Sequence, residues 1–503
     1  NIDNIANIYI GKQAAYNIGD GSYNVAIGEE AMKSSGTAAD NHANYNVAVG
    51  NQAGYGLTTG DYNVFLGSRA GFASTTVQGN IAIGYLAMSV HTTGVRNIAI
   101  GTYAMDDTNA GSTSLGSTDN IFMGYDAGGG TWTDAASNYN VGIGNYVMDS
   151  ALDGANYNIG IGYGALSAIT TSDTNVGIGY LALNELTTNV DNVAVGFVAG
   201  RRITGERNVA LGSYALDYGY VVNDSVAIGY QSAQYATGSY NTFVGFQAGR
   251  GGTTSAPYSS GQYNVALGAY AFDSFTTGDD NCIIGRSAGH QISSGDYNVC
   301  LGTMAGDTLT TGTNNTYLGY HADASANSVT NEIVLAASDS QLGGAGTETI
   351  RIGRASDFIT NDFGENATWT HSSDRRIKKD IEDNKLGLKF INKLKTRNFK
   401  KKAPSEYPEE FIQHDPNETE RKNPDKIHYG FVAQEVKEAM DSVGHSEVPV
   451  WKENRDGMQE LGETELITPL VKAVQELTEK NERLENKIKD LEIFIMDKLG
   501  DDK

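Results

Sequence analysis

The segment 372–381 holds the residue types that a covalent reaction on the chain itself would need. It reads SSDRRIKKDI and brings Ser373, Asp374 and Lys378 together in a strongly basic run. A serine becomes a nucleophile when a neighbouring base takes its proton, and a lysine can act as that base only in its neutral form. The neighbouring cations favour the neutral form, as burial on assembly would. Folding would then create the base.

Other interpretations of these residues stay open. Ser373 or Asp374 can cap a helix, with the basic residues paired to Asp380 and Glu382. For a cut between Ser373 and Asp374, attack by the Ser373 hydroxyl on its own carbonyl would close a four-membered ring, and attack on the preceding carbonyl would cut before Ser373. A water, or a serine of a neighbouring chain, would allow the cut after Ser373. Spacing alone is weak evidence for a Ser-Lys pair.

The chemistry of the chain changes near residue 370. The first 370 residues carry 11 Lys and Arg against 31 Asp and Glu, a net charge of −20, whereas the remainder carries 25 against 29, a net charge of −4. Of the 61 glycines, 55 lie before this point. We therefore expect two different kinds of structure on either side of it.

Composition excludes several function classes. The acidic surface of the long N-terminal part repels phosphate backbones, so no nucleic acid is expected as a partner. No stretch approaches the roughly 20 apolar residues that a membrane-spanning helix needs, so no membrane insertion is expected. Cys282 and Cys300 have opposite strand parity, which argues against a disulfide between them. The chain begins at Asn1 without Met or a visible signal peptide, so we expect a fragment or a processed form.

A repeat dominates residues 1–353. Its motif is N-[VI]-x-[ILV]-G-x-x-A, as in NVAIG at Asn24–Gly28, and it occurs in 18 copies, with ten of the 17 intervals equal to 17 residues. Alternation within each copy has period two, with one strictly apolar face and one tolerant face, which predicts a strand. The small residue three positions after each glycine indicates close approach of backbone.

Five-residue strands with one apolar face must stack to be stable, so we predict a solenoid. Asn recurs at the same place in 17 of 18 copies, Ser225 being the exception, which predicts a ladder of amides along the stack. At roughly 4.8 Å per rung the rod would be about 85 Å long. The turns lack the Gly-Asp pattern of calcium-binding rolls, so we expect no metal and no cofactor, although calcium at the turn Asp residues stays an alternative.

Four intervals between repeats are longer than the rest, and such insertions leave a solenoid as surface loops that commonly carry recognition. Trp132 and Tyr258 lie within these insertions, and Tyr220 lies in another connecting segment. We predict Trp132 and Tyr258 as candidate receptor contacts through stacking on a glycan, the alternative being that each aromatic ring folds back on the rod.

After residue 380 the sequence is typical of an α+β domain. The run Leu386–Leu394 has helical spacing, and His428–Met440 reads as a strand leading into a helix. Residues 466–499 form a coiled-coil pattern, with Ile467 and Leu470 opening its two apolar positions. A single Asn481 among β-branched residues favours two strands by peptide rules, which conflicts with the trimer implied by the resemblances below.

The repeats resemble the head repeats of trimeric autotransporter adhesins and the shafts of bacteriophage tail fibres. That resemblance implies three chains side by side, each a narrow parallel β-roll or β-helix. The C-terminal motifs SSDRRIKKDI, GFVAQEV and LITPLVKAVQEL together resemble the intramolecular chaperone domain of endosialidase-type phage tailspikes, a self-cleaving peptidase family. Its Ser-Asp-x-Arg-x-Lys pattern is matched by Ser373, Asp374, Arg376 and Lys378.

The second resemblance implies that the C-terminal domain drives trimer assembly, and that the chain is cut once between Ser373 and Asp374 with Ser373 and Lys378 as the reactive pair. We expect a mainly β fold in four segments: a shaft (1–353), a transition (354–370), an α+β chaperone and autoprotease domain (371–465) and a coiled-coil helix (466–499).

The expected function is that of a structural and receptor-binding phage tail fibre in the virion, outside the cell. Its expected partners are two further copies of the chain, a host-cell surface receptor and other tail proteins upstream. A bacterial surface adhesin and a glycan-depolymerising tailspike are the alternatives. The latter needs a pair of carboxylates fixed in a pocket, and a rod of 17-residue rungs offers no obvious cleft.

Overall fold

The computed structural model divides the chain into two compact units, Asn1–Ser372 and Ser373–Lys503. It describes residues 5–500 except 35–36, 38–40, 109–113, 253–256, 338–339, 364–365, 372–373, 412, 421–423 and 446–449.

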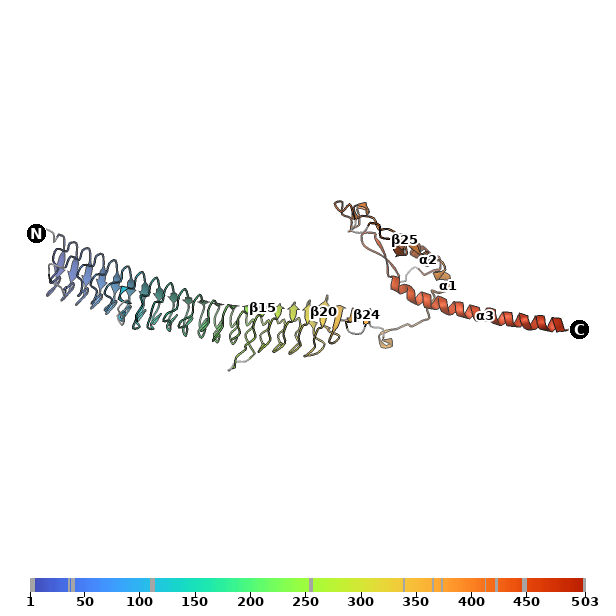
Figure 1. Ribbon diagram of the computed structural model, residues 1–503, viewed down its shortest axis with the longest axis horizontal. Coiled ribbons are helices and arrows are strands. Elements are labelled where there is room, and N and C mark those ends of the chain that lie inside the picture. Colours follow the sequence, from blue (N-terminus) through green and yellow to red (C-terminus); the bar gives the residue numbers. More distant parts are fainter. Residues whose placement is uncertain are drawn as a thin grey trace. The chain divides into compact units, whose positions relative to one another are not determined.

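The first unit is a parallel β-solenoid in which each repeat contributes one three-residue strand (Figure 1). Each strand pairs in parallel with the strand of the next repeat, as Val25 pairs with Val47 across one of the longer intervals. Insertions therefore leave the register unchanged, and the solenoid of ~17-residue repeats is confirmed. The strands are β1 (Ile8–Ile10), β2 (Val25–Ile27), β3 (Val47–Val49), β4 (Val64–Leu66), β5 (Ile81–Ile83), β6 (Ile98–Ile100), β7 (Ile121–Met123), β8 (Val141–Ile143), β9 (Ile159–Ile161), β10 (Val176–Ile178), β11 (Val193–Val195), β12 (Val209–Leu211), β13 (Val226–Ile228), β14 (Thr242–Val244), β15 (Val265–Leu267), β16 (Cys282–Ile284), β17 (Val299–Leu301) and β18 (Thr316–Leu318).

The C-terminal end of the solenoid departs from the repeat. Strands β20 (Ile333–Ala336) and β22 (Thr349–Gly353) continue the parallel stack. Strands β23 (Phe358–Asp362) and β24 (Asn366–His371) then add to β22 in antiparallel order. The segment 354–370, predicted as a transition, thus contains β23 and most of β24. Outside this sheet, β19 (Ala322–Asp323) pairs with β21 (Leu342–Gly343), and the 3-10 helix η2 spans Ser114–Gly116.

The two faces of each strand differ in burial. The central strand residue points into the rod, and Ala26, Phe65 and Tyr317 at this position are all fully buried. The flanking aliphatic residues are only partly buried, as Val25 and Ile27 are. The tolerant face of the sequence pattern is therefore the interior of the rod, and the strictly apolar face lies outside.

The interior tolerates different sizes because neighbouring positions compensate in volume. Phe65 fills the space beside Gly54 and Gly71, and a Cβ on Gly71 would lie 2.4 Å from its ring. The Phe122 ring lies in the same way against Gly128 and Gly142. Interiors are close-packed, so a large residue on one rung requires a missing side chain on an adjacent one.

A buried ladder of asparagines runs through the repeats, as the sequence predicts. Asn298 shows its geometry: its Nδ2 donates to Asn281 Oδ1 at 3.1 Å and to the Gly312 carbonyl at 2.9 Å. Its Oδ1 accepts from the backbone N–H and the Nδ2 of Asn315 at 3.1 and 3.0 Å. Ser225 keeps part of this pattern, since its Oγ accepts from the Asn241 N–H at 3.1 Å. The ladder pairs turn carbonyls that would otherwise be buried without donors.

Three carboxylates on neighbouring rungs lie partly buried in the shaft. Burial raises the pKa of Asp106 to about 7, with further contributions from the charges of Asp126 and Asp107. Burial also raises the pKa of Asp149 to about 6 and raises that of Asp126. Ionisation of this group therefore opposes folding of the shaft near neutral pH.

The second unit is a small α+β structure that ends in a long helix. Strands β25 (Arg397–Phe399) and β26 (His428–Gly430) pair antiparallel, as do β27 (Trp451–Glu453) and β28 (Gln459–Leu461). Its core cluster includes Phe390, Val436, Met440 and Leu466. Its helices are α1 (Leu388–Ile391), α2 (Ala433–Asp441) and α3 (Ile467–Gly500), with 3-10 turns η3 (Arg375–Ile377), η4 (Pro404–Glu406) and η5 (Glu463–Leu466).

The sequence pattern located these elements with different accuracy. The predicted strand and helix at His428–Met440 correspond to β26 and α2, and the heptads correspond to α3. The helical run Leu386–Leu394 forms only the single turn of α1. Glu476 on α3 accepts a hydrogen bond from the Leu388 N–H at 2.7 Å, which fixes α1 against α3.

We predict that Asn298→Ala destabilises the shaft by about 2–4 kcal/mol, because it leaves the Gly312 carbonyl and two donors of Asn315 without partners. Asn298→Ser is the matched control and should cost less, since Ser225 fills the same position naturally. Calorimetry gives the fall in transition temperature, and amide exchange should show lost protection at Asn315. Equal stability of the Ala variant and the unmodified protein would contradict the structural role of the ladder.

We predict that Asp106→Asn raises the transition temperature of the shaft at pH 8 but not at pH 4. The folded-state pKa is raised, so the contribution of this carboxyl is favourable below the unfolded value near 3.9 and is lost as pH rises toward about 7. Asp134→Asn, at an exposed carboxylate in the same part of the shaft, is the control. An equal effect of Asp106→Asn at both pH values would refute this coupling.

Candidate cleavage site and assembly surfaces

The segment around the predicted cleavage site forms a capped turn on the surface of the second unit. Asp374 caps η3, and its Oδ1 accepts a hydrogen bond from the Arg376 N–H at 2.8 Å. The Arg376 guanidinium also holds the carboxylate, with Nη2 2.7 Å from Oδ2. These hydrogen bonds lower the pKa of Asp374. The capping interpretation therefore applies to Asp374, with Arg376 as its ion-pair partner.

Of the predicted reactive pair, Ser373 and Lys378, the structure describes only Lys378. Ser373 lies outside the described residues. Lys378 ends η3, donates its backbone N–H to the Arg375 carbonyl, and has an exposed side chain. Residues 374–382 are all exposed in the single chain. A general base built from Lys378 would therefore need burial by another part of the assembled protein.

The two predicted receptor contacts have different environments. Trp132 is fully buried: its Nε1 donates to the Gly128 carbonyl at 3.0 Å, and its ring meets Phe122 edge to face at 5.8 Å. A sugar cannot stack on the indole in this conformation. Tyr258 is partly exposed, so of these two residues it is the one that offers ring surface to a ligand.

Tyr258 lies in one of the two longest insertions and belongs to an aromatic cluster with residues of the preceding rungs. Its ring lies 5.2 Å from Tyr218 and 5.9 Å from Tyr220. The Arg202 guanidinium lies 4.4 Å from the Tyr218 ring. Asp217 precedes Tyr218 in the chain, and burial raises its pKa to about 6 against the opposing effect of the neighbouring arginines. Such a cluster can offer flat apolar faces and cations to a ligand.

The outer face of the shaft carries continuous apolar columns. The outer strand residues leave a partly exposed aliphatic stripe on each rung, as at Val299 and Leu301 on β17. A column of eleven aromatic rings follows the strand-closing glycines by one or two residues, with neighbouring ring centroids 5.1 to 6.2 Å apart. Its members are Tyr85, Tyr103, Tyr125, Tyr146, Tyr163, Tyr180, Phe197, Tyr214, Tyr230, Phe246 and Tyr270.

The sequence analysis missed this column. The signal that could have found it is the recurrence of Tyr or Phe just after the glycine in consecutive repeats, which is weaker than the Asn signal because the offset varies between one and two residues. A contiguous apolar surface of this length is unusual for a chain that acts alone.

The apolar heptad face of α3 is also exposed. Ile467, Leu470, Val474 and Leu477 are between 44% and 58% exposed although α1 also packs on this helix. Helices with this pattern bury it against other helices. The second unit therefore has an assembly surface of its own.

Within the described residues there is no group of three or more His, Cys, Asp or Glu side chains arranged to hold a metal ion. The same part of the chain contains no helix that combines the length and apolar character needed to cross a bilayer. Cys282 and Cys300 are both free.

A β-solenoid with an unpaired apolar face, in a chain that also carries a small α+β unit with an exposed heptad helix, has the features of a fibre with an assembly module. Residues 373–445 match the family described as chaperone of endosialidase. This match and the solenoid fit a protein of the tail-fibre or tailspike type, and the family's involvement in trimerisation is consistent with a homotrimer. No curated protein matches the chain, and no solved structure matches it.

Proposed function

We propose that this chain is the subunit of a homotrimeric bacteriophage tail fibre that contacts a host-cell receptor. Its C-terminal unit aligns three chains and is then removed by a single cut between Ser373 and Asp374. The shaft is a structural element and not an enzyme.

The observation that carries the proposal is that the largely apolar face of each strand points outward from the rod. A soluble solenoid would place polar residues there, as solvated sheet faces do. In this chain, Val, Ile or Leu holds nearly all of these positions from Ile8 to Leu318, the exceptions being Met123, Thr242, Cys282 and Thr316, and most of the side chains are only partly covered. Two further copies of the same rod would cover the face along its whole length.

A separate assembly unit answers a problem that such a rod creates. Neighbouring rungs are nearly identical, so two chains could pair one rung out of register at little local cost. The exposed heptad face of α3 can bring three chains together at one defined point before the shafts pair. After removal of the unit, the trimer could not unfold and reassemble by the same pathway. The trimer would then be kinetically stable.

The cut rests on the family match and on the sequence around Ser373. The exposed position of Lys378 in the single chain supports a reaction that waits for assembly, because an exposed lysine lacks the burial that favours its neutral form. For the receptor, the Tyr258 cluster supports a glycan contact, since sugars stack on aromatic faces and hydrogen-bond to arginine.

We predict that the recombinant protein yields a shaft fragment of about 373 residues, and that Ser373→Ala and Lys378→Ala remain full length. Denaturing gels and intact mass measure the products. Lys379→Ala is the matched control for loss of one positive charge and should still be cut. Full-length product from the unmodified protein would refute self-cleavage, and cleavage in both variants would refute these residues as the reactive pair.

We also predict that a shaft produced without residues 374–503 fails to refold into trimers, because nothing sets its register. Sedimentation should find three chains per particle for protein made with the C-terminal unit and mostly monomer or aggregate without it. Efficient refolding of the truncated shaft, or particles of one or two chains, would contradict the proposed role of the unit.

A further inference from the structure

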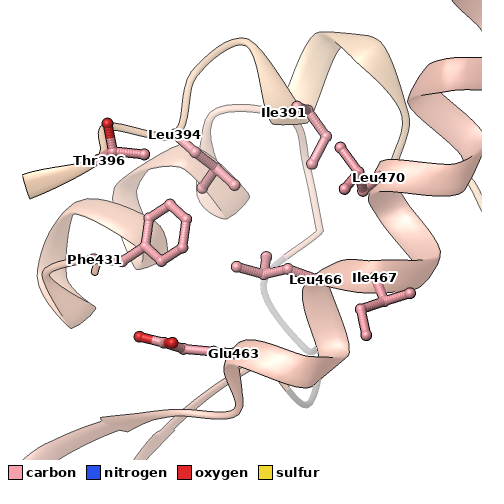
Figure 2. A pocket seen from close by; sticks show the side chains of 8 residues that line it. All are labelled: Ile391, Leu394, Thr396, Phe431, Glu463, Leu466, Ile467 and Leu470. Carbon is pink, nitrogen blue, oxygen red and sulfur yellow. The ribbon is translucent and has the colours of Figure 1, made fainter. Parts of the chain in front are cut away.

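An apolar groove lies at the start of α3 (Figure 2). Its volume is about 360 Å³. Figure 2 shows Ile391 and Leu394 on one side, Phe431 on another, and Leu466, Ile467 and Leu470 at the start of the helix, and all six line the groove. Only Thr396 and Glu463 add polar groups to this lining.

The groove opens onto the heptad face. Ile467 and Leu470 are the first residues of the two core heptad positions and are 58% and 51% exposed. Leu466 occupies the position beside them that faces a neighbouring helix, and it is packed into the unit's own core. The groove is therefore continuous with the surface on which another α3 helix would pack.

The flanking heptad positions indicate how a second helix would lie. In a parallel coiled coil, the residue that precedes a core position faces the residue five places later on the neighbouring helix. Five such pairs occur here, and the two members of each pair are compatible in chemistry. The first and last pairs are apolar, the second joins two small residues, and the third and fourth each join a lysine to a glutamate. The pairs are Leu466, the last residue of η5 directly before α3, with Val471, then Ala473 with Thr478, Lys480 with Glu485, Lys487 with Glu492, and Phe494 with Leu499.

The charged pairs distinguish the two orientations. Parallel, in-register helices bring Lys480 toward Glu485 and Lys487 toward Glu492 of the neighbour. An antiparallel arrangement brings the lysine positions toward each other and the glutamate positions toward each other, which is unfavourable. The pattern therefore selects parallel copies of this same chain.

Val471 is the residue that would reach the groove. It is apolar and 52% exposed in the single chain. Its partner position is Leu466, which lines the groove. Glu485 and Glu492, which hold the same heptad position further along the helix, would face lysines of the neighbour. Val471 is apolar, and it would face the apolar groove around Leu466.

We propose that the groove of each chain receives Val471 of a neighbouring copy in a parallel, in-register bundle of α3 helices. The proposal rests on the homotrimer proposed above and names the contact that joins the globular part of one second unit to the helix of the next. Assembly of the helices then completes the apolar packing around Leu466, so folding of the unit and its trimerisation are coupled.

Disulfide trapping tests this contact. In a background with Cys282→Ser and Cys300→Ala, the pair Leu466→Cys and Val471→Cys should form disulfides between chains on mild oxidation, giving a three-chain product on non-reducing gels. The pair Lys480→Cys and Glu485→Cys has the same spacing further along α3 and reports on the bundle alone. Each pair should cross-link through reduction-sensitive bonds.

The two cysteine pairs distinguish failure of the groove contact from failure of the parallel homotrimer. Cross-linking at 480 and 485 without cross-linking at 466 and 471 would overturn the groove contact and leave the parallel trimer standing. Cross-linking at neither pair would overturn the parallel homotrimer and, with it, the groove contact.

A second variant avoids disturbing the core. Val471→Glu changes an exposed side chain, so the isolated unit should still fold, but in the assembly it would bury an unpaired carboxylate in an apolar groove. In a Ser373→Ala background, we expect the yield of trimer on refolding to fall by about fivefold or more, whereas Thr468→Glu, at an exposed neighbouring residue that is neither a core nor a flanking heptad position, should leave it unchanged. Equal yields for Val471→Glu and Thr468→Glu would overturn the proposal.

Discussion

Each rung of the shaft is too narrow to bury both faces of its strand. The inner face meets the turn of the same repeat and leaves room for Ala, or for Phe only where a neighbouring side chain is absent, as Gly71 is beside Phe65. The outer face carries mostly Val, Ile or Leu, and its own chain covers these side chains only in part. Covering one half-exposed aliphatic side chain contributes about 1 kcal/mol, and the shaft repeats this term along 18 rungs. Association is thus the remaining source of stability for a thin solenoid.

The asparagine ladder runs in one direction along the regular stack of rungs, so its last member needs a different hydrogen-bond partner. At the last rungs Glu332 takes the place of Asn: its N–H donates to Asn315 Oδ1 at 2.9 Å, but its carboxylate accepts from the Tyr317 hydroxyl at 3.1 Å and the Gly346 N–H at 2.8 Å. The amide series therefore closes on a side chain that offers no further amide. Antiparallel β23 then covers β22 beyond this point, which limits continued parallel pairing at that edge.

The sequence predicts the repeat, its register and the amide ladder because one stacked hydrogen bond demands the same residue on each rung. It does not predict which strand face is inside. The alternation along the strand places Ala26 on one face and its two neighbours on the other. Which of these faces is buried depends on the width of the rung, and that width is set by the whole repeat. Trp132 and Tyr258 show the same limit: both lie in insertions, and only tertiary packing beside Phe122 distinguishes the buried ring from the partly exposed one.

The number of chains is where local and global signals conflict, and the width of the apolar face of α3 bears on it. Asn481 and the β-branched core positions favour two helices by peptide rules. Yet exposed apolar residues extend beyond the core positions on both flanks, at Val471 near the start and at Phe494 and Leu499 near the end. In a two-stranded coil each helix meets one neighbour and these flanks stay largely in water, whereas in a three-stranded coil each helix meets two neighbours and both flanks are covered. A wide apolar face thus favours three helices, the arrangement that is also consistent with the family's involvement in trimerisation.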